Sequence, residues 1–135
     1  MKMKQIGHTV LYVGAVGISV FLLFFFVCVA WIGYDVKDQC QSAKRAYEGT
    51  CVEALSSLLR DEKRGFRERN DAIWALGQLG DSRATPVLES YFTGIIPARE
   101  PLDKSISQYE LKKAIALTKG GVNVTAFIWR YGHEL

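Results

Sequence analysis

Residues 67–92 read RERNDAIWALGQLGDSRATPVLESYF, and this stretch decides the fold. Apolar residues recur every three or four positions on both sides of Gly80-Asp81, as they do along one face of an α-helix. Gly80 is typical of a helix end, and Asp81 is a good cap for the start of the next helix. The stretch therefore predicts two amphipathic helices joined by a tight turn.

The same signals predict the neighbouring helices. Thr50 is expected to cap a helix over about residues 51–61, and a polar helix over residues 35–47 is expected to precede it. A last helix is predicted from Ser105, which opens a Ser-Ile-Ser-Gln capping box, to about Lys119. In the helix over residues 66–79 the predicted core positions are Phe66, Ala72, Ile73, Leu76 and Leu79. Gly77 interrupts that helix, which predicts that another helix crosses closely there.

An internal repeat organises these helices into two pairs. The apolar positions at 54–55 and 58–59 recur 33 positions later at 87–88 and 91–92, whereas Ala72-Ile73 recurs 42 positions later as Ala114-Ile115. The nine extra positions fall in a loop over residues 93–104. The sequence thus predicts an all-α domain of two helix pairs, the second with an enlarged connection.

The motif Ala-Leu-Gly-Gln-Leu-Gly-Asp at residues 75–81, followed by Arg83, resembles HEAT-like repeats of the short kind found in bilin-lyase-type repeat proteins. The resemblance covers about residues 50–121. It implies a short α-solenoid whose helices present surface rather than chemistry. It also implies an alternative function, that of a lyase-like or chromophore-handling factor. We expect the helix before Tyr47 to cover one end of the two pairs and residues 122–135 the other.

The N-terminal region is apolar and uncharged from residue 9 to residue 32. That length is sufficient for a helix to cross a bilayer, and Tyr12, Trp31 and Tyr34 lie near its ends as interfacial aromatic residues do. We therefore predict a transmembrane helix within residues 1–34 and a helical domain over residues 35–135. A cleaved signal peptide is the alternative, but its apolar core is shorter, and residues 27–31 make a poor cleavage site.

Lys2 and Lys4 precede the predicted span and favour a cytoplasmic N terminus, although Lys37, Lys44 and Arg45 on the other side weaken this signal. The prediction is a single-pass membrane protein with its C-terminal domain outside the cytoplasm. There, Cys40 and Cys51 are expected to form a disulfide. The bond requires the chain to bend back before Tyr47, or the next helix to cross beside the first. Two buried free thiols are the alternative.

Composition argues against several classes of function. The net charge is +3 without a clustered basic stripe, so no nucleic-acid partner is expected. The only histidines, His8 and His133, lie near opposite ends of the chain, and no Cys or His spacing fits a metal site. No catalytic motif, cofactor motif or small-molecule site is evident. We therefore predict a non-enzymatic scaffold, anchored in a membrane, that binds a protein partner.

Two sets of residues are candidates for partner binding. The first is one side of the helix over residues 66–79, and the second consists of apolar residues in the enlarged loop. For Trp74 we favour packing against the last helix near Leu111 or Lys112, and for the loop residues we favour folding back over the core. The arginines at 64, 67 and 69 are interpreted as a solvated face. The candidate binding residues are Arg67, Asp71, Trp74, Gln78, Ile95 and Ile96.

Overall fold

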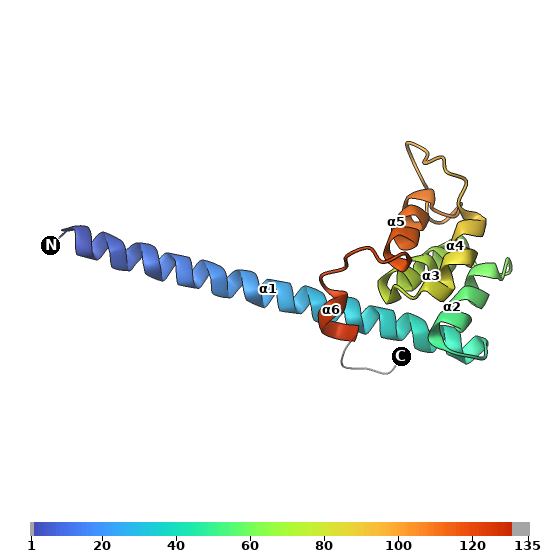
Figure 1. Ribbon diagram of the computed structural model, residues 1–135, viewed down its shortest axis with the longest axis horizontal. Coiled ribbons are helices and arrows are strands. Elements are labelled where there is room, and N and C mark those ends of the chain that lie inside the picture. The colour runs from blue at the N-terminus through green and yellow to red at the C-terminus, as the bar shows by residue number, and fades with distance from the viewer. Residues whose placement is uncertain (1, 131–135) are drawn as a thin grey trace.

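The computed structural model describes residues 2–130, with side chains from Gly7 onward. These residues form helices and connecting segments without a β-strand. Figure 1 shows one long helix, with the shorter helices gathered around its C-terminal part. This confirms the predicted all-α class, a long apolar helix followed by a short solenoid. The helices are α1 (Lys2–Ala46), α2 (Cys51–Arg60), α3 (Phe66–Leu79), the 3₁₀ helix η1 (Ser82–Ala84), α4 (Thr85–Tyr91), α5 (Gln108–Thr118) and α6 (Ala126–Trp129).

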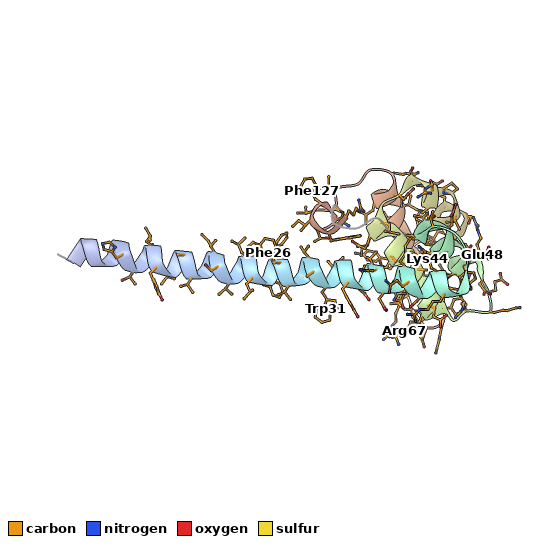
Figure 2. The ribbon with its side chains drawn as sticks, turned by 90° about the horizontal axis from the view of Figure 1, so that it is seen from below. Phe26, Trp31, Lys44, Glu48, Arg67 and Phe127 are labelled. Carbon is orange, nitrogen blue, oxygen red and sulfur yellow. A yellow bond between two sulfur atoms is a disulfide. The ribbon has the colours of Figure 1, made fainter. Side chains whose placement is uncertain are left out.

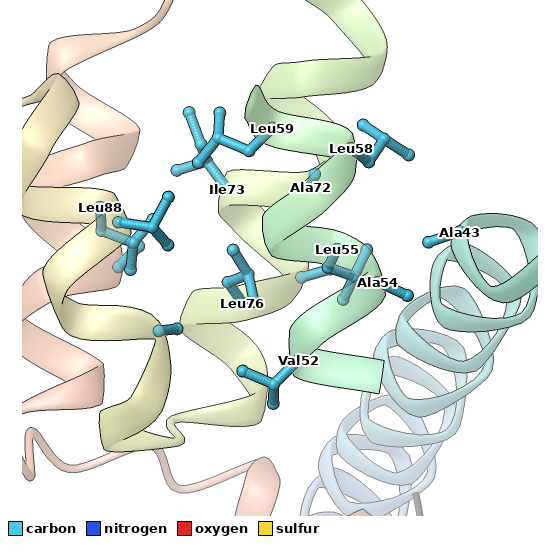
Figure 3. Packing of buried hydrophobic residues seen from close by; sticks show 14 of the residues in the cluster. Ala43, Val52, Ala54, Leu55, Leu58, Leu59, Ala72, Ile73, Leu76 and Leu88 are labelled. Atoms are coloured by element: carbon cyan, nitrogen blue, oxygen red, sulfur yellow. The ribbon is translucent and has the colours of Figure 1, made fainter. Parts of the chain in front are cut away.

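The core lies between the two predicted helix pairs, α2 with α3 and α4 with α5. Helix α3 is central, because it packs extensively against both α2 and α5. The side chains between these helices are almost all aliphatic, and Figure 3 shows several of them interdigitating. Their removal from water is the main term that stabilises the stack. The largest fully buried members are Leu55, Leu59, Ile73, Leu76, Leu88 and Leu111.

Gly77 marks the crossing of α3 and α5, as the sequence predicted. A Cβ atom added to Gly77 would lie 2.8 Å from the Cα atom of Ala114. That separation is far below van der Waals contact, so only glycine allows the two helices to approach this closely.

The start of α2 agrees with the prediction, and the start of α5 corrects one. The Thr50 side chain accepts a hydrogen bond from the backbone N–H of Glu53, whose carboxylate accepts one from the Thr50 N–H (2.7 Å). Helix α5 begins at Gln108, so Ser105 is not its cap. Ser107 caps it and accepts from the Glu110 N–H (3.1 Å). Glu110, three residues on, supplies the acidic residue that suits a helix start.

Phe66 does not belong to the core stripe of α3, contrary to the sequence prediction. Its side chain is 38% exposed, whereas Ala72, Ile73 and Leu76 are fully buried. Phe66 is the first residue of the helix, and the first buried apolar position of α3, Ala72, comes later along it. Its ring instead lies 5.8 Å from the guanidinium of Arg69.

Cys40 of α1 and Cys51 of α2 form a disulfide, as predicted, with their Cα atoms 5.2 Å apart. Helix α1 continues unbroken to Ala46, so the chain does not bend back within it. Helix α2 crosses beside α1 instead, which is the second of the two routes that the sequence left open. The C-terminal part of α1 thereby covers the first helix pair, as expected.

The C-terminal segment lies elsewhere than predicted. Residues 122–130 do not cap the second helix pair, because α6 packs against α1, where Ala126 and Trp129 contact Val29 and Val36. The rest of the expected cap, residues 131–135, lies outside the described residues. Gly33 explains the docking site, since a Cβ there would lie 2.9 Å from Cβ of Trp129. The sequence pattern of α6 gave no indication of this long-range contact.

The N-cap position of α3 offers a simple stabilising change. Gly65 has extended backbone angles (φ −63°, ψ 152°), makes no side-chain cap and leaves open space around an added Cβ atom. Gly65→Ser is expected to raise the free energy of unfolding by about 1 kcal/mol, through a new cap and a less flexible unfolded chain. Thermal unfolding in detergent measures the change. Gly65→Ala, which lacks the capping oxygen, should gain less, and equal gains would contradict a capping role.

Candidate interaction surface

The four candidate residues on α3 do not form one open surface. Arg67 and Asp71 are exposed, whereas Trp74 and Gln78 are half-buried. Trp74 contacts the core between the helix pairs and the smaller cluster between α1 and α6, and it lies beside Gly77 and Ala114 at the α5 crossing. Trp74 is therefore half-buried beside α5 rather than fully exposed.

Gln78 holds the C-terminal segment. Its side-chain oxygen accepts a hydrogen bond from Asn123 Nδ2 (2.7 Å), and its backbone carbonyl accepts one from Arg130 Nε (3.0 Å). Arg130 Nη2 donates to the same carbonyl. These bonds tie the end of α3 to the segment that carries α6, so the described contacts of Gln78 are internal to the protein.

Asp71 faces the side of the domain where α1 passes. Partial burial raises the pKa of its carboxyl above the usual value, Arg67 opposes that rise, and the negative charges of Asp35 and Glu68 add to it. Asp71 and Arg67 thus remain a small charged surface on α3, next to α1. They are the two members of the predicted α3 set that reach solvent freely.

Arg69 was interpreted as part of a solvated face, and this is wrong. Its side chain is buried, and its Nε donates to the backbone carbonyl of Leu59 (2.9 Å). The guanidinium also lies 5.6 Å from the ring of Tyr91. Arg69 therefore connects α2, α3 and α4. The long aliphatic stem of arginine makes such burial feasible when the head group is hydrogen-bonded.

The apolar residues of the enlarged loop are exposed, contrary to the favoured expectation that they fold back. The loop spans residues 92–107, and Ile95 near its tip is 75% exposed. Phe92 and Ile106 at the two loop ends pack against the core instead. Because these two side chains already cover the second helix pair, the residues between them are left on the surface. In Figure 1 this loop projects beyond α4 and α5.

Asn70 fixes one end of this loop. Its Nδ2 donates to the backbone carbonyls of Leu102 (2.9 Å) and Ser105 (2.8 Å), and its Oδ1 accepts from the Ser107 N–H (2.9 Å). Asn70 is only 5% exposed. Its amide thus links α3 to the loop and to the residue that caps α5.

Glu100 fixes the loop a second time, at the start of α5. Its carboxylate accepts from Ser107 Oγ (2.6 Å) and from the N–H groups of Gln108 (2.7 Å) and Tyr109 (3.2 Å). Desolvation works against ionisation, but these hydrogen bonds outweigh it and lower the pKa of Glu100. The Gln108 side chain in turn accepts from the Thr93 N–H (2.8 Å).

The result is an ordered apolar surface, which we call the loop patch. It consists of exposed side chains from the loop and the first turn of α5, beside a shallow groove of about 370 Å³. An exposed apolar cluster in a fixed conformation is typical of an interaction site. The loop patch comprises Ile95, Ile96, Leu102 and Tyr109.

Asn70 and Glu100 are the site-forming residues that sequence reasoning missed. Asn70 follows a run of charged residues and reads as solvated, and its partners lie 32 to 37 positions away. The Ser107-Gln-Tyr-Glu110 box was the available signal that the loop ends later than expected. Among the residues that the structure describes, no group of three or more His, Cys, Asp or Glu side chains lies close enough to hold a metal ion.

Comparison with known proteins adds one finding. Residues 68–93 match the family model described as PBS lyase HEAT-like repeat. The matched segment contains α3 from its third residue onward, the Gly80-Asp81 turn and α4, and it supports a HEAT-like repeat protein. No curated protein and no solved structure is significantly similar to the chain.

Proposed function

We propose that this protein is a membrane-anchored, non-enzymatic adaptor that binds a protein partner through the loop patch. The observation that carries the proposal is the loop itself, which exposes apolar side chains yet is held by the hydrogen bonds that Asn70 and Glu100 form with it and with the start of α5. A preorganised apolar surface binds without a large ordering cost. Arg67 and Asp71 on α3 are a second, polar candidate surface.

The length, hydropathy and exposure of α1 support the membrane anchor. Helix α1 is long and apolar enough to cross a membrane, and almost none of its most apolar part is buried within the protein. A core helix of a soluble domain would be covered. The end of the apolar run also contacts α6, so cleavage near Ala30 would remove Val29 from its packed cluster. Both observations favour a retained span over a cleaved signal peptide.

The Cys40–Cys51 disulfide supports a domain outside the cytoplasm, because such bonds persist in oxidising compartments. In right-side-out membrane vesicles, an impermeant maleimide should label Ser90→Cys in a Cys28→Ala background. Lys4→Cys should react only after permeabilisation. The reverse pattern would contradict the proposed orientation.

The bond itself has a direct test. The chain has three cysteines, so alkylation of denatured, unreduced protein should modify Cys28 alone, and reduction should expose the other two. Mass spectrometry counts the modified thiols. Three alkylated cysteines without reduction would remove the disulfide, and with it the main support for the proposed compartment.

Partner binding is tested by affinity capture from detergent-solubilised membranes. The wild-type chain should retain a stoichiometric protein that the double variant Ile95→Ser/Ile96→Ser loses, with an unchanged melting temperature. Val122→Ser is the matched control, since Val122 is also exposed and lies in the C-terminal segment away from the loop. A separate Arg67→Ser/Asp71→Ser variant tests the polar surface. Retention by the Ile95/Ile96 variant would exclude the loop patch.

The alternative function is a lyase-like or chromophore-handling factor. Its support is the match of residues 68–93 to the PBS lyase HEAT-like repeat. The same capture experiment distinguishes the two, because a copurifying tetrapyrrole gives a visible absorbance band. Such a band in the wild-type sample, without a stoichiometric protein, would favour the alternative.

A further inference from the structure

Helix α6 lies against the part of α1 that belongs to the apolar run. Ala126 and Trp129, three positions apart, face α1 and pack against Val29 and Val36, and Phe25 and Ile32 adjoin this cluster. The absence of a side chain at Gly33 lets the Trp129 side chain lie close to the backbone of α1. All of these α1 positions except Val36 precede Asp35, the first acidic residue of the chain.

The height of α6 along α1 corresponds to a membrane boundary. A helix over residues 9–32 is about 36 Å long, whereas a bilayer core is about 30 Å thick. The surplus turn of the apolar run therefore extends into the headgroup region, where Trp31 and Tyr34 are exposed as interfacial aromatics. Figure 2 shows Phe127 beside α1 at the level between Phe26 and Trp31.

Apolar side chains in α6 and just before it are exposed rather than packed against α1. Val124 is 65% and Ile128 43% exposed, and Phe127 between them is exposed as well. The sequence has no charged residue between Lys119 and Arg130. An uncharged segment with outward apolar side chains, docked at the end of a membrane span, continues the lipid-facing surface of that span.

We infer that residues 122–129 form a second membrane contact, in which α6 lies in the bilayer interface with Val124, Phe127 and Ile128 toward lipid. This inference rests on the proposed membrane anchor. The binding partner of this surface is the lipid bilayer, because Val124, Phe127 and Ile128 adjoin exposed apolar residues of α1. The domain is then held to the bilayer at two points, the span and α6.

Fluorescence quenching by brominated lipid tests the contact in the full chain. The protein carries Cys28→Ala, one introduced cysteine labelled with an environment-sensitive fluorophore, and an intact disulfide, and it is reconstituted into phosphatidylcholine vesicles. A probe at Ile128→Cys should be blue-shifted and lose at least half of its emission with brominated lipid. A probe at Val124→Cys provides an independent second position.

Two controls separate this inference from the anchor. A probe at Leu22→Cys, in the middle of the apolar run, reports the span and should be strongly quenched. A probe at Ser90→Cys on α4 should show no quenching. Quenching at positions 22 and 128 or 124 supports the second contact. Quenching at position 22 alone overturns it and leaves the anchor intact, and no quenching at any position overturns both.

Discussion

Gly77→Val is expected to lower the free energy of unfolding by about 3 kcal/mol. The added side chain meets the Cα and Cβ atoms of Ala114, and backbone atoms cannot rotate out of the way. Helices α3 and α5 must therefore separate, which loosens the most extensive helix contact of the domain. Chemical unfolding in detergent, followed by circular dichroism, measures the loss.

Helix propensity favours replacing Gly77, whereas the steric clash with Ala114 disfavours it. A smaller substitution, Gly77→Ala, shows which of the two dominates. Alanine is favoured over glycine in a helix by about 1 kcal/mol, so a stabilised Gly77→Ala protein would mean that the close approach costs little. We expect net destabilisation instead. Ala116→Val on the exposed face of α5 is the control, and should cost less than about 1 kcal/mol. If Gly77→Val is as stable as the wild type, α3 and α5 do not cross at this position.

Asn70→Ala is expected to have the second large effect, a loss of about 3 kcal/mol. It leaves the buried Ser107 N–H without its acceptor and two loop carbonyls without their donor. The loop should also become mobile, so trypsin should cleave after Arg99 and Lys104 much faster than in the wild type. Peptide mapping during limited proteolysis follows both bonds separately.

Asn123→Ala is the matched control for Asn70. The variant removes a half-buried amide that holds the C-terminal segment through Gln78, and the hydrogen bonds of Asn123 do not involve the loop. Cleavage after Arg99 and Lys104 should therefore stay at the wild-type rate. A loop equally resistant in Asn70→Ala and wild-type protein would show that Glu100 alone suffices to order it.

Local patterns predicted the helices but not the contacts that fix the candidate surface. Periodicity and the Thr50 cap depend on residues a few positions apart, so the two helix pairs were predictable. A glycine inside a helix indicates that another helix approaches closely, although the sequence does not say that Ala114 is the residue it meets. Asn70 forms hydrogen bonds with residues more than thirty positions away, and the sequence around Asn70 does not indicate which residues these are. The loop's exposed isoleucines were misjudged because Phe92 and Ile106 already cover the core.

The position of the C-terminal segment was also not predictable from the local sequence. Four residues of α6 have no helical signal of their own, and their position depends on the surface that α1 leaves uncovered at Gly33. Burial of Arg69 was missed because a charge run was interpreted by composition alone. In both cases tertiary packing determines where the residues lie, and the spacing of residues along the sequence does not reveal that packing.

Helix α1 continues without a break from the apolar run into the domain. There it is joined to α2 by the disulfide and packs against α2 and α6. With α1 as the membrane span that we propose, the span and the domain move together as one rigid body. Rotation of α1 about its own axis would then move the loop patch along an arc parallel to the bilayer. A change in the tilt of α1 would change the distance between the loop patch and the bilayer surface. Under the proposed function, a neighbouring membrane protein bound to the span would therefore set the direction in which the loop patch faces.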